Sequence, residues 1–156
     1  AYINGYSEPK NKPQYPPANI YLSDINFIED KRIAKIDYAG GGIVAPLSEF
    51  LVFMKALVNG HLVKEATLNQ MISDDVKMGF PAIGFDYGYA VWKTRAIPLL
   101  MPEKYFCWGC VGVTGAFMFY HPQTEAYVIG TFNDKSYTSK ALSFMIKNII
   151  RPLLKI

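Results

Sequence analysis

Residues 109–120 read Gly-Cys-Val-Gly-Val-Thr-Gly-Ala-Phe-Met-Phe-Tyr, and this stretch decides the fold. Aromatic and β-branched residues favour strands, whereas Gly, Pro and polar residues separate them. The same pattern recurs on either side, so we predict strands at Tyr87–Trp92, Lys104–Cys110, Thr114–Tyr120 and Ala126–Phe132. Residues 121–125 are short enough to join the last two as a hairpin. The sequence therefore predicts an antiparallel meander of three to four strands.

Two helical patterns precede this strand-rich region. Pro46 occupies a first helical position, and apolar residues recur at helical spacing from Leu47 to Val58 before Asn59-Gly60 ends the pattern. A shorter helix is predicted for Lys64–Ser73, which carries its own apolar stripe.

A closing helix follows the strands. It should begin near Ser136 or Thr138 and be disturbed by Pro152, because proline removes a backbone donor. Its apolar stripe consists of Leu142, Met145, Ile146, Ile149 and Ile150. Helices, then a meander, then another helix predict the α+β class, an antiparallel sheet with flanking helices.

Length and composition limit the remaining possibilities. At 156 residues the chain has the length of a single domain, and 51% of its residues are hydrophobic. Its net charge of +3 is spread without a run of five like charges, which gives no sign of nucleic-acid binding. No apolar run approaches the length needed to cross a bilayer, so no membrane segment is predicted in this chain.

The first part of the chain differs from the rest. Four of the ten residues from Glu8 to Pro17 are proline, which favours an extended path over a surface. We therefore divide the chain into an extended Pro-rich lead-in, residues 1–37, and one folded unit, residues 38–156.

Several separate segments resemble one family in the same order. They are Tyr38–Val44 with its three glycines, Phe80-Pro81 with Tyr87-Gly88-Tyr89, the 109–115 stretch with the hairpin after it, and Ile129–Asn133. Together they resemble the penicillin-recognising serine hydrolases, the superfamily of class C β-lactamases, D-alanyl-D-alanine carboxypeptidases and esterases. The resemblance implies that residues 38–156 are the C-terminal part of a β-lactamase-like domain.

The resemblance also implies a chemistry. In the family, the serine of an S-x-x-K motif attacks a carbonyl carbon and a Y-x-N element assists. Ser7-Glu8-Pro9-Lys10 matches the first motif, but Pro9 denies it the helix that would hold lysine against serine. Tyr2-Ile3-Asn4 matches the second, yet it lies at the start of the chain. We therefore expect no catalytic residue in this chain and a nucleophile supplied upstream.

By resemblance, the substrate-binding residues are Cys110, Val111, Gly112, Val113 and Thr114. The backbone N–H of Val113 would be one of two oxyanion donors, a role that any side chain tolerates. Cys110 stands where the family has Lys or His, and Val111 where it has Thr or Ser. A thiol with a reference pKa of about 8.5 is mostly neutral at pH 7, so the cation that would meet a substrate carboxylate is missing.

Other uses of the cysteines and histidines are less favoured. Cys107 and Cys110 form a literal C-x-x-C, but residues three apart on a strand point to opposite faces, which favours packed free thiols. His61 and His121 do not lie at a zinc spacing from them, so neither a metal nor a cofactor is predicted. Cys110 has no evident base, because His121 lies at the far end of the next strand.

Two functional hypotheses follow. In the first, the chain belongs to a serine hydrolase that acts on a small acyl or peptidoglycan-like substrate and is inactive alone; the scissile bond, whether peptide, lactam or ester, stays open. In the second, it is a non-catalytic binding or regulatory module with a degenerate penicillin-binding fold. An interaction domain unrelated to the family is a third possibility.

The resemblance also predicts partners and a compartment. An exposed sheet edge and helix face should bind the missing N-terminal segment of the same protein or another copy of the chain. The compartment is extracytoplasmic and bacterial if the protein follows most of the family.

Overall fold

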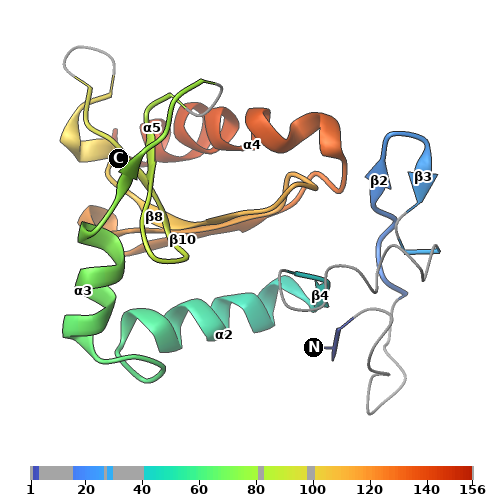
Figure 1. Cartoon of the computed structure of the whole chain (residues 1–156), viewed down its shortest axis with the longest axis horizontal. Helices are drawn as coiled ribbons and strands as arrows, with labels where there is room; N and C mark the ends of the chain where they lie inside the picture. The colour runs from blue at the N-terminus through green and yellow to red at the C-terminus, as the bar shows by residue number, and fades with distance from the viewer. Residues whose placement is uncertain are drawn as a thin grey trace.

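A computed structural model describes residues 2–3, 16–26, 28–29, 41–80, 83–97 and 101–155. It confirms the α+β class: one antiparallel sheet carries helices on both of its faces (Figure 1). None of the helices in these ranges is long and apolar enough to cross a membrane.

The central sheet is a meander in which each strand pairs with its neighbour along the chain. Its six strands lie in the order β10-β9-β8-β7-β6-β5, and every pairing is antiparallel. The predicted meander is confirmed, but three to four strands was too few. The strands are β5 (Val76–Lys77), β6 (Phe85–Tyr87), β7 (Trp92–Thr94), β8 (Trp108–Val111), β9 (Phe117–His121) and β10 (Ala126–Gly130).

One face of the sheet is covered by the two helices that precede it. Helix α2 (Leu47–Val58) follows Pro46, and helix α3 (Glu65–Ser73) follows after a short loop, so both predicted helices are confirmed. They pack on the strands through a core of four buried residues, Met54, Leu68, Val91 and Trp108. Gly60, with a φ of +74°, lies just beyond the end of α2 and donates its N–H to the Leu57 carbonyl.

The closing helix covers the other face, as Figure 1 shows with α4 and α2 on opposite sides of the strands. It consists of α4 (Thr138–Phe144), a π-helical turn η4 (Met145–Ile150) and α5 (Arg151–Leu153). The predicted helix is confirmed and ends one residue after Pro152, whereas the π-helical turn was not predicted. A second core joins this helix to the sheet through Phe85, Cys107, Phe117, Phe119, Val128, Ala141, Leu142, Met145, Ile146 and Ile150.

The predicted strand Tyr87–Trp92 is wrong. Residues 88–91 form the turn between β6 and β7, in which the Gly88 N–H donates to the Val91 carbonyl at 2.7 Å and Ala90 has a φ of +58°. The sequence pattern was misleading because the aromatic residues at its two ends belong to different strands: Tyr87 is the last residue of β6 and Trp92 is the first of β7.

Two other predicted strands begin too early. Lys104 lies in a 3₁₀ turn, η1 (Glu103–Tyr105), and the strand begins only at Trp108. Thr114 belongs to the turn after β8, and the next strand begins at Phe117. The predicted strand Ala126–Phe132 is confirmed as far as Gly130.

The division of the chain at residue 37 remains a prediction. Most of the proline-rich run lies outside the described residues, and residues 16–20 have no regular secondary structure. Two small ladders lie beside the main sheet: β2 (Tyr21–Leu22) with β3 (Ile25–Asn26), and β1 (Tyr2–Ile3) with β4 (Ile43–Val44). The Tyr21 N–H donates to the Asn133 carbonyl at 2.8 Å, which links the first ladder to the segment after β10.

Candidate functional site

Strand β8 divides the candidate site residues between the two faces of the sheet. Residues directly opposite each other on paired strands share a face, and successive residues alternate. Cys110 pairs with Met118, which packs in the α2–α3 core, so its side chain lies on the α2–α3 face. Val111 packs against the core of the closing helix, on the opposite face. The site inferred from resemblance is therefore not one continuous surface of side chains.

Cys110 is half-buried, and this burial raises the pKa of its thiol. Its thiol lies 3.9 Å from the Val111 carbonyl oxygen, the only hydrogen-bond acceptor assigned to it within the described part of the chain. Cys107, three residues earlier, is fully buried on the other face, where burial raises the pKa of its thiol to about 12. Both cysteines are free, as the sequence predicted, and neither is a reactive thiolate near neutral pH.

The segment after β8 is a tight turn fixed to its surroundings. The Gly112 N–H donates to the Ala116 carbonyl at 2.8 Å, and the Gly115 N–H donates to the Gly112 carbonyl at 3.1 Å. Gly115 has a φ of +71°, a conformation that glycine adopts without strain. The Thr114 carbonyl accepts from the Asp134 N–H at 2.9 Å, which joins this turn to the segment after β10.

Val113 lies at the exposed corner of this turn. Its side chain is 53% exposed, and its N–H donates no hydrogen bond to any of the described residues. Its carbonyl accepts a hydrogen bond from the hydroxyl of Thr138, the first residue of α4. The turn therefore holds a free backbone donor at a fixed position against the closing helix.

A groove of about 850 Å³ opens between the ends of β6, β7 and β8 and the closing helix. Val111, Gly112 and Val113 lie on its wall, whereas Cys110 and Thr114 do not. Its apolar lining is made of Met78, Ile83, Phe85, Trp92, Met101, Tyr105, Leu142 and Ile146 together with Val111 and Val113. A mostly apolar lining with few polar groups is typical of small-molecule sites.

The charged groups of the groove are all cationic. They are Lys135, Lys147 and Arg151, and among the described residues no Asp or Glu belongs to the lining. Thr138, Ser139 and Ser143 add hydroxyl groups along the helix side. The sequence analysis missed these polar and cationic residues. A signal was present, because one side of the closing helix carries a polar or cationic residue at every fourth position: Ser139, Ser143, Lys147 and Arg151.

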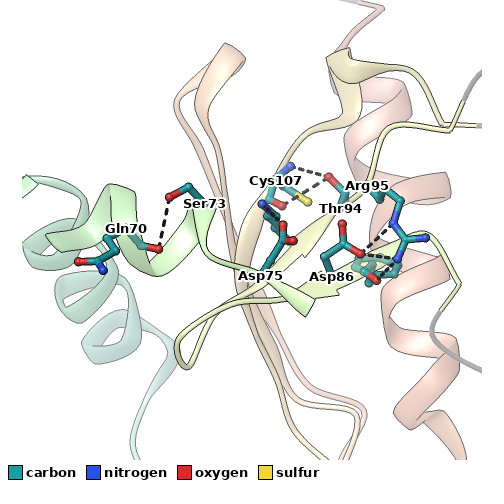
Figure 2. A network of polar contacts seen from close by, with 9 residues as sticks. Gln70, Ser73, Asp75, Asp86, Thr94, Arg95 and Cys107 are labelled. Atoms are coloured by element: carbon teal, nitrogen blue, oxygen red, sulfur yellow. Dashed lines mark hydrogen bonds and ion pairs between the residues drawn. The ribbon is translucent and has the colours of Figure 1, made fainter. Parts of the chain in front are cut away.

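A second polar cluster lies at strands β5, β6 and β7 and the residues next to them (Figure 2). The Asp86 carboxylate is buried and accepts from the Arg95 Nε–H at 2.8 Å and from a second nitrogen of the same guanidinium, and this raises the pKa of Arg95. That guanidinium also donates to the Met78 and Phe85 carbonyls, and Lys93 pairs with Asp75. Because every one of these charges has a partner, we interpret the cluster as one that stabilises the fold.

His121 is held in the core and cannot serve Cys110 as a base. It is fully buried, with Nε2 at 2.9 Å from the Lys104 carbonyl and Nδ1 at 2.8 Å from the Thr124 hydroxyl. Nε2 must carry the proton to donate to that carbonyl, and Nδ1 then accepts from the hydroxyl. His121 also lies on the face of Phe119, opposite to Cys110. No group of three His, Cys, Asp or Glu side chains in the described ranges could hold a metal ion.

Comparison with known proteins gives no match: no family model matches the chain, and neither does a curated protein or a solved structure.

Proposed function

We propose that this chain forms the substrate-binding sheet of a β-lactamase-like serine hydrolase, which transfers the acyl group of a peptide, lactam or ester to a serine in another stretch of polypeptide. The observation that carries the proposal is the N–H of Val113 in the turn after β8, which donates to none of the residues that the structure describes. By resemblance, this donor would meet the oxyanion of a tetrahedral intermediate.

The position of that donor supports the proposal. An oxyanion hole works because its donors are held in place before the reaction begins. Here the turn is fixed from three sides, through the Gly112–Ala116 pairing, the Thr114–Asp134 bond and the Thr138 hydroxyl. A backbone donor held in this way needs no particular side chain, so Val113 can fill the role.

The arrangement of the resembling segments is a second support. In the sheet, β8 is an inner strand, β9 and β10 follow as a hairpin, and the closing helix packs behind them. A site strand followed by a hairpin and a C-terminal helix is what we expect of this part of the chain from the resemblance, which supports the proposal.

Cys110 and His121 do not form a catalytic pair. The Cys110 thiol is protonated at neutral pH, and both ring nitrogens of His121 are already hydrogen-bonded on the other face. We therefore expect the isolated chain not to hydrolyse nitrocefin or a p-nitrophenyl ester.

The test uses the natural polypeptide that carries this chain. A fluorescent penicillin or fluorophosphonate should label one serine covalently, and mass spectrometry should place that serine upstream of this chain, outside residues 1–156. Val113→Pro removes the donor N–H and should lower kcat by about 100- to 1,000-fold, whereas Val113→Ala keeps the N–H and should stay close to wild type. Absence of a labelled serine, or equal loss in both variants, contradicts the proposal.

A second candidate is a non-catalytic binding or regulatory module on the same sheet. It is favoured by the neutral thiol of Cys110 at the place where the family carries a cation. This candidate predicts saturable but reversible binding of an acyl ligand and no labelled serine in the natural polypeptide, so the labelling experiment separates the two.

A further inference from the structure

The groove beside the closing helix combines an apolar floor with charges of one sign. The side chains of Phe85, Trp92 and Val111 come from three adjacent strands and face Leu142 and Ile146 of the helix. Its volume of about 850 Å³ lies within the range of about 300–1,000 Å³ that is usual for small-molecule sites. An apolar surface of this size gains from being covered by an apolar ligand.

The cations of the groove have no acidic partners. Within the described ranges, Lys135, Lys147 and Arg151 form no ion pair with any carboxylate. Lys147 and Arg151 are exposed and stand four residues apart, which places them on one side of the helix. The Arg151 guanidinium lies 6.0 Å from the centre of the Tyr105 ring, and this ring belongs to the same groove lining. In the described part of the chain, two unpaired cations therefore stand near each other on the helix side of an apolar groove.

From the combination of an apolar floor and unpaired cations we propose that the groove binds a long-chain fatty acid. The hydrocarbon chain lies along the floor of Phe85, Trp92 and Ile146, and the carboxylate lies between Lys147 and Arg151. An amphiphile with one anionic end matches the two properties of the groove, whereas a cationic amphiphile meets repulsion at the same end. The groove shares Val111 and Val113 with the proposed hydrolase site, but this inference rests on the apolar floor and the cations of the closing helix and not on the serine chemistry.

The first measurement is a titration of the 156-residue chain with cis-parinaric acid, a polyene fatty acid whose fluorescence rises in an apolar site. Binding should be saturable with a single site, and palmitate should displace the probe. Hexadecylamine, of equal chain length and opposite charge, should displace it at least about tenfold less well. In a series of saturated acids, affinity should rise by up to about fourfold per methylene until the groove is filled.

Two variants locate the ligand. Lys147→Glu combined with Arg151→Glu should weaken palmitate binding by about tenfold or more, since both cations are replaced by repelling charges. Ser143→Trp places a large ring in the groove and should abolish binding without touching a charge. The matched controls are Lys55→Glu and Ser48→Trp, which change exposed positions on α2, across the sheet, and should bind palmitate like wild type.

Several outcomes overturn the proposal. They include no saturable binding, equal displacement by palmitate and hexadecylamine, or equal loss in the groove variants and the α2 controls. Displacement of the probe by an acidic amphipathic peptide, with palmitate inert, would assign the groove to a protein helix instead. The remaining possibility, that a second copy of the chain occupies the groove, is tested by sedimentation of the wild type and Ser143→Trp. If the wild type is a dimer that binds no palmitate and Ser143→Trp is a monomer, the groove is a dimer interface.

Discussion

Gly109 on β8 stands directly opposite Phe119 on β9, and the Met118 carbonyl oxygen lies 2.0 Å from the place that a Cβ on Gly109 would occupy. No side chain fits at that distance, because the obstacle is backbone of the neighbouring strand. The two strands that carry the candidate oxyanion donor therefore depend on this glycine for their close approach.

The first prediction concerns this contact. Gly109→Ala should destabilise the fold by about 1–3 kcal/mol or more, because β8 and β9 must move apart. Gly79→Ala is the matched control, since a Cβ there meets nothing within 4 Å. Urea unfolding followed by tryptophan fluorescence measures both, and equal stability of the two variants would contradict the predicted clash.

The second prediction concerns the core under the closing helix. Phe119 is 0% exposed, so Phe119→Ala should lower the free energy of unfolding by about 3–5 kcal/mol through lost burial and the cavity it leaves. Phe80 is 89% exposed, and Phe80→Ala should change stability by less than about 0.5 kcal/mol. A similar loss in both variants would show that Phe119 is not a core residue.

The third prediction concerns Thr94, a buried residue of β7. Its hydroxyl accepts from the Cys107 N–H at 2.9 Å and lies 3.1 Å from the Tyr105 carbonyl, to which it can donate. Thr94→Val keeps the shape but leaves a buried donor unpaired, which should cost about 1–3 kcal/mol in thermal or urea unfolding. Thr94→Ser keeps the hydroxyl and should be the more stable of the two, and the reverse order would contradict this role.

The fourth prediction is a pH dependence. The pKa of Cys107 is raised from 9.0 to about 12 by burial. The folded chain therefore keeps a proton that the unfolded chain loses, so this contribution to stability is complete below pH 9 and lost as the pH rises towards 12. Over that interval the free energy of unfolding should fall by up to about 1.4 kcal/mol per pH unit from this thiol.

Cys107→Ala tests the pH prediction, because it removes the titrating group. Its unfolding free energy should decline less steeply between pH 9 and 12 than that of the wild type. Cys110→Ala is the comparison. Burial also raises the pKa of Cys110, but the residue is only half-buried, so its removal should change the slope less than Cys107→Ala does. Equal slopes for the wild type and Cys107→Ala would contradict the assignment.

The helices could be predicted from the sequence because apolar spacing and breaking residues agree there. Pro46 and Gly60 mark the two ends of α2, and the stripe from Leu142 to Ile150 faces the sheet as expected. The strands were harder because they are short. Both residues of β5 are exposed, so this strand shows no alternation of buried and exposed positions. Ala90 adopts a positive φ, which the residue type alanine does not predict.

The candidate site could be predicted only in part. The predicted strand Lys104–Cys110 overlaps β8 only from Trp108 to Cys110 and omits Val111. Alternation along an extended segment correctly separated Cys107 from Cys110. The same alternation also separates Cys110 from Val111, which the resemblance had grouped in one site. The groove escaped prediction because it depends on Trp92 and Arg151, which are distant in the sequence and meet only in the folded chain.

The strict neighbour-to-neighbour order of the six strands has a consequence for how the chain folds. Each strand pairs with the next one along the chain, and the longest connection, residues 95–107 between β7 and β8, is still modest, so the entropy lost in closing each loop is limited. The β9–β10 hairpin, with its short connection at residues 122–125, is the natural place for pairing to start. Assembly can then proceed one strand at a time, and we expect a faster refolding rate than for sandwiches whose strands pair across long loops.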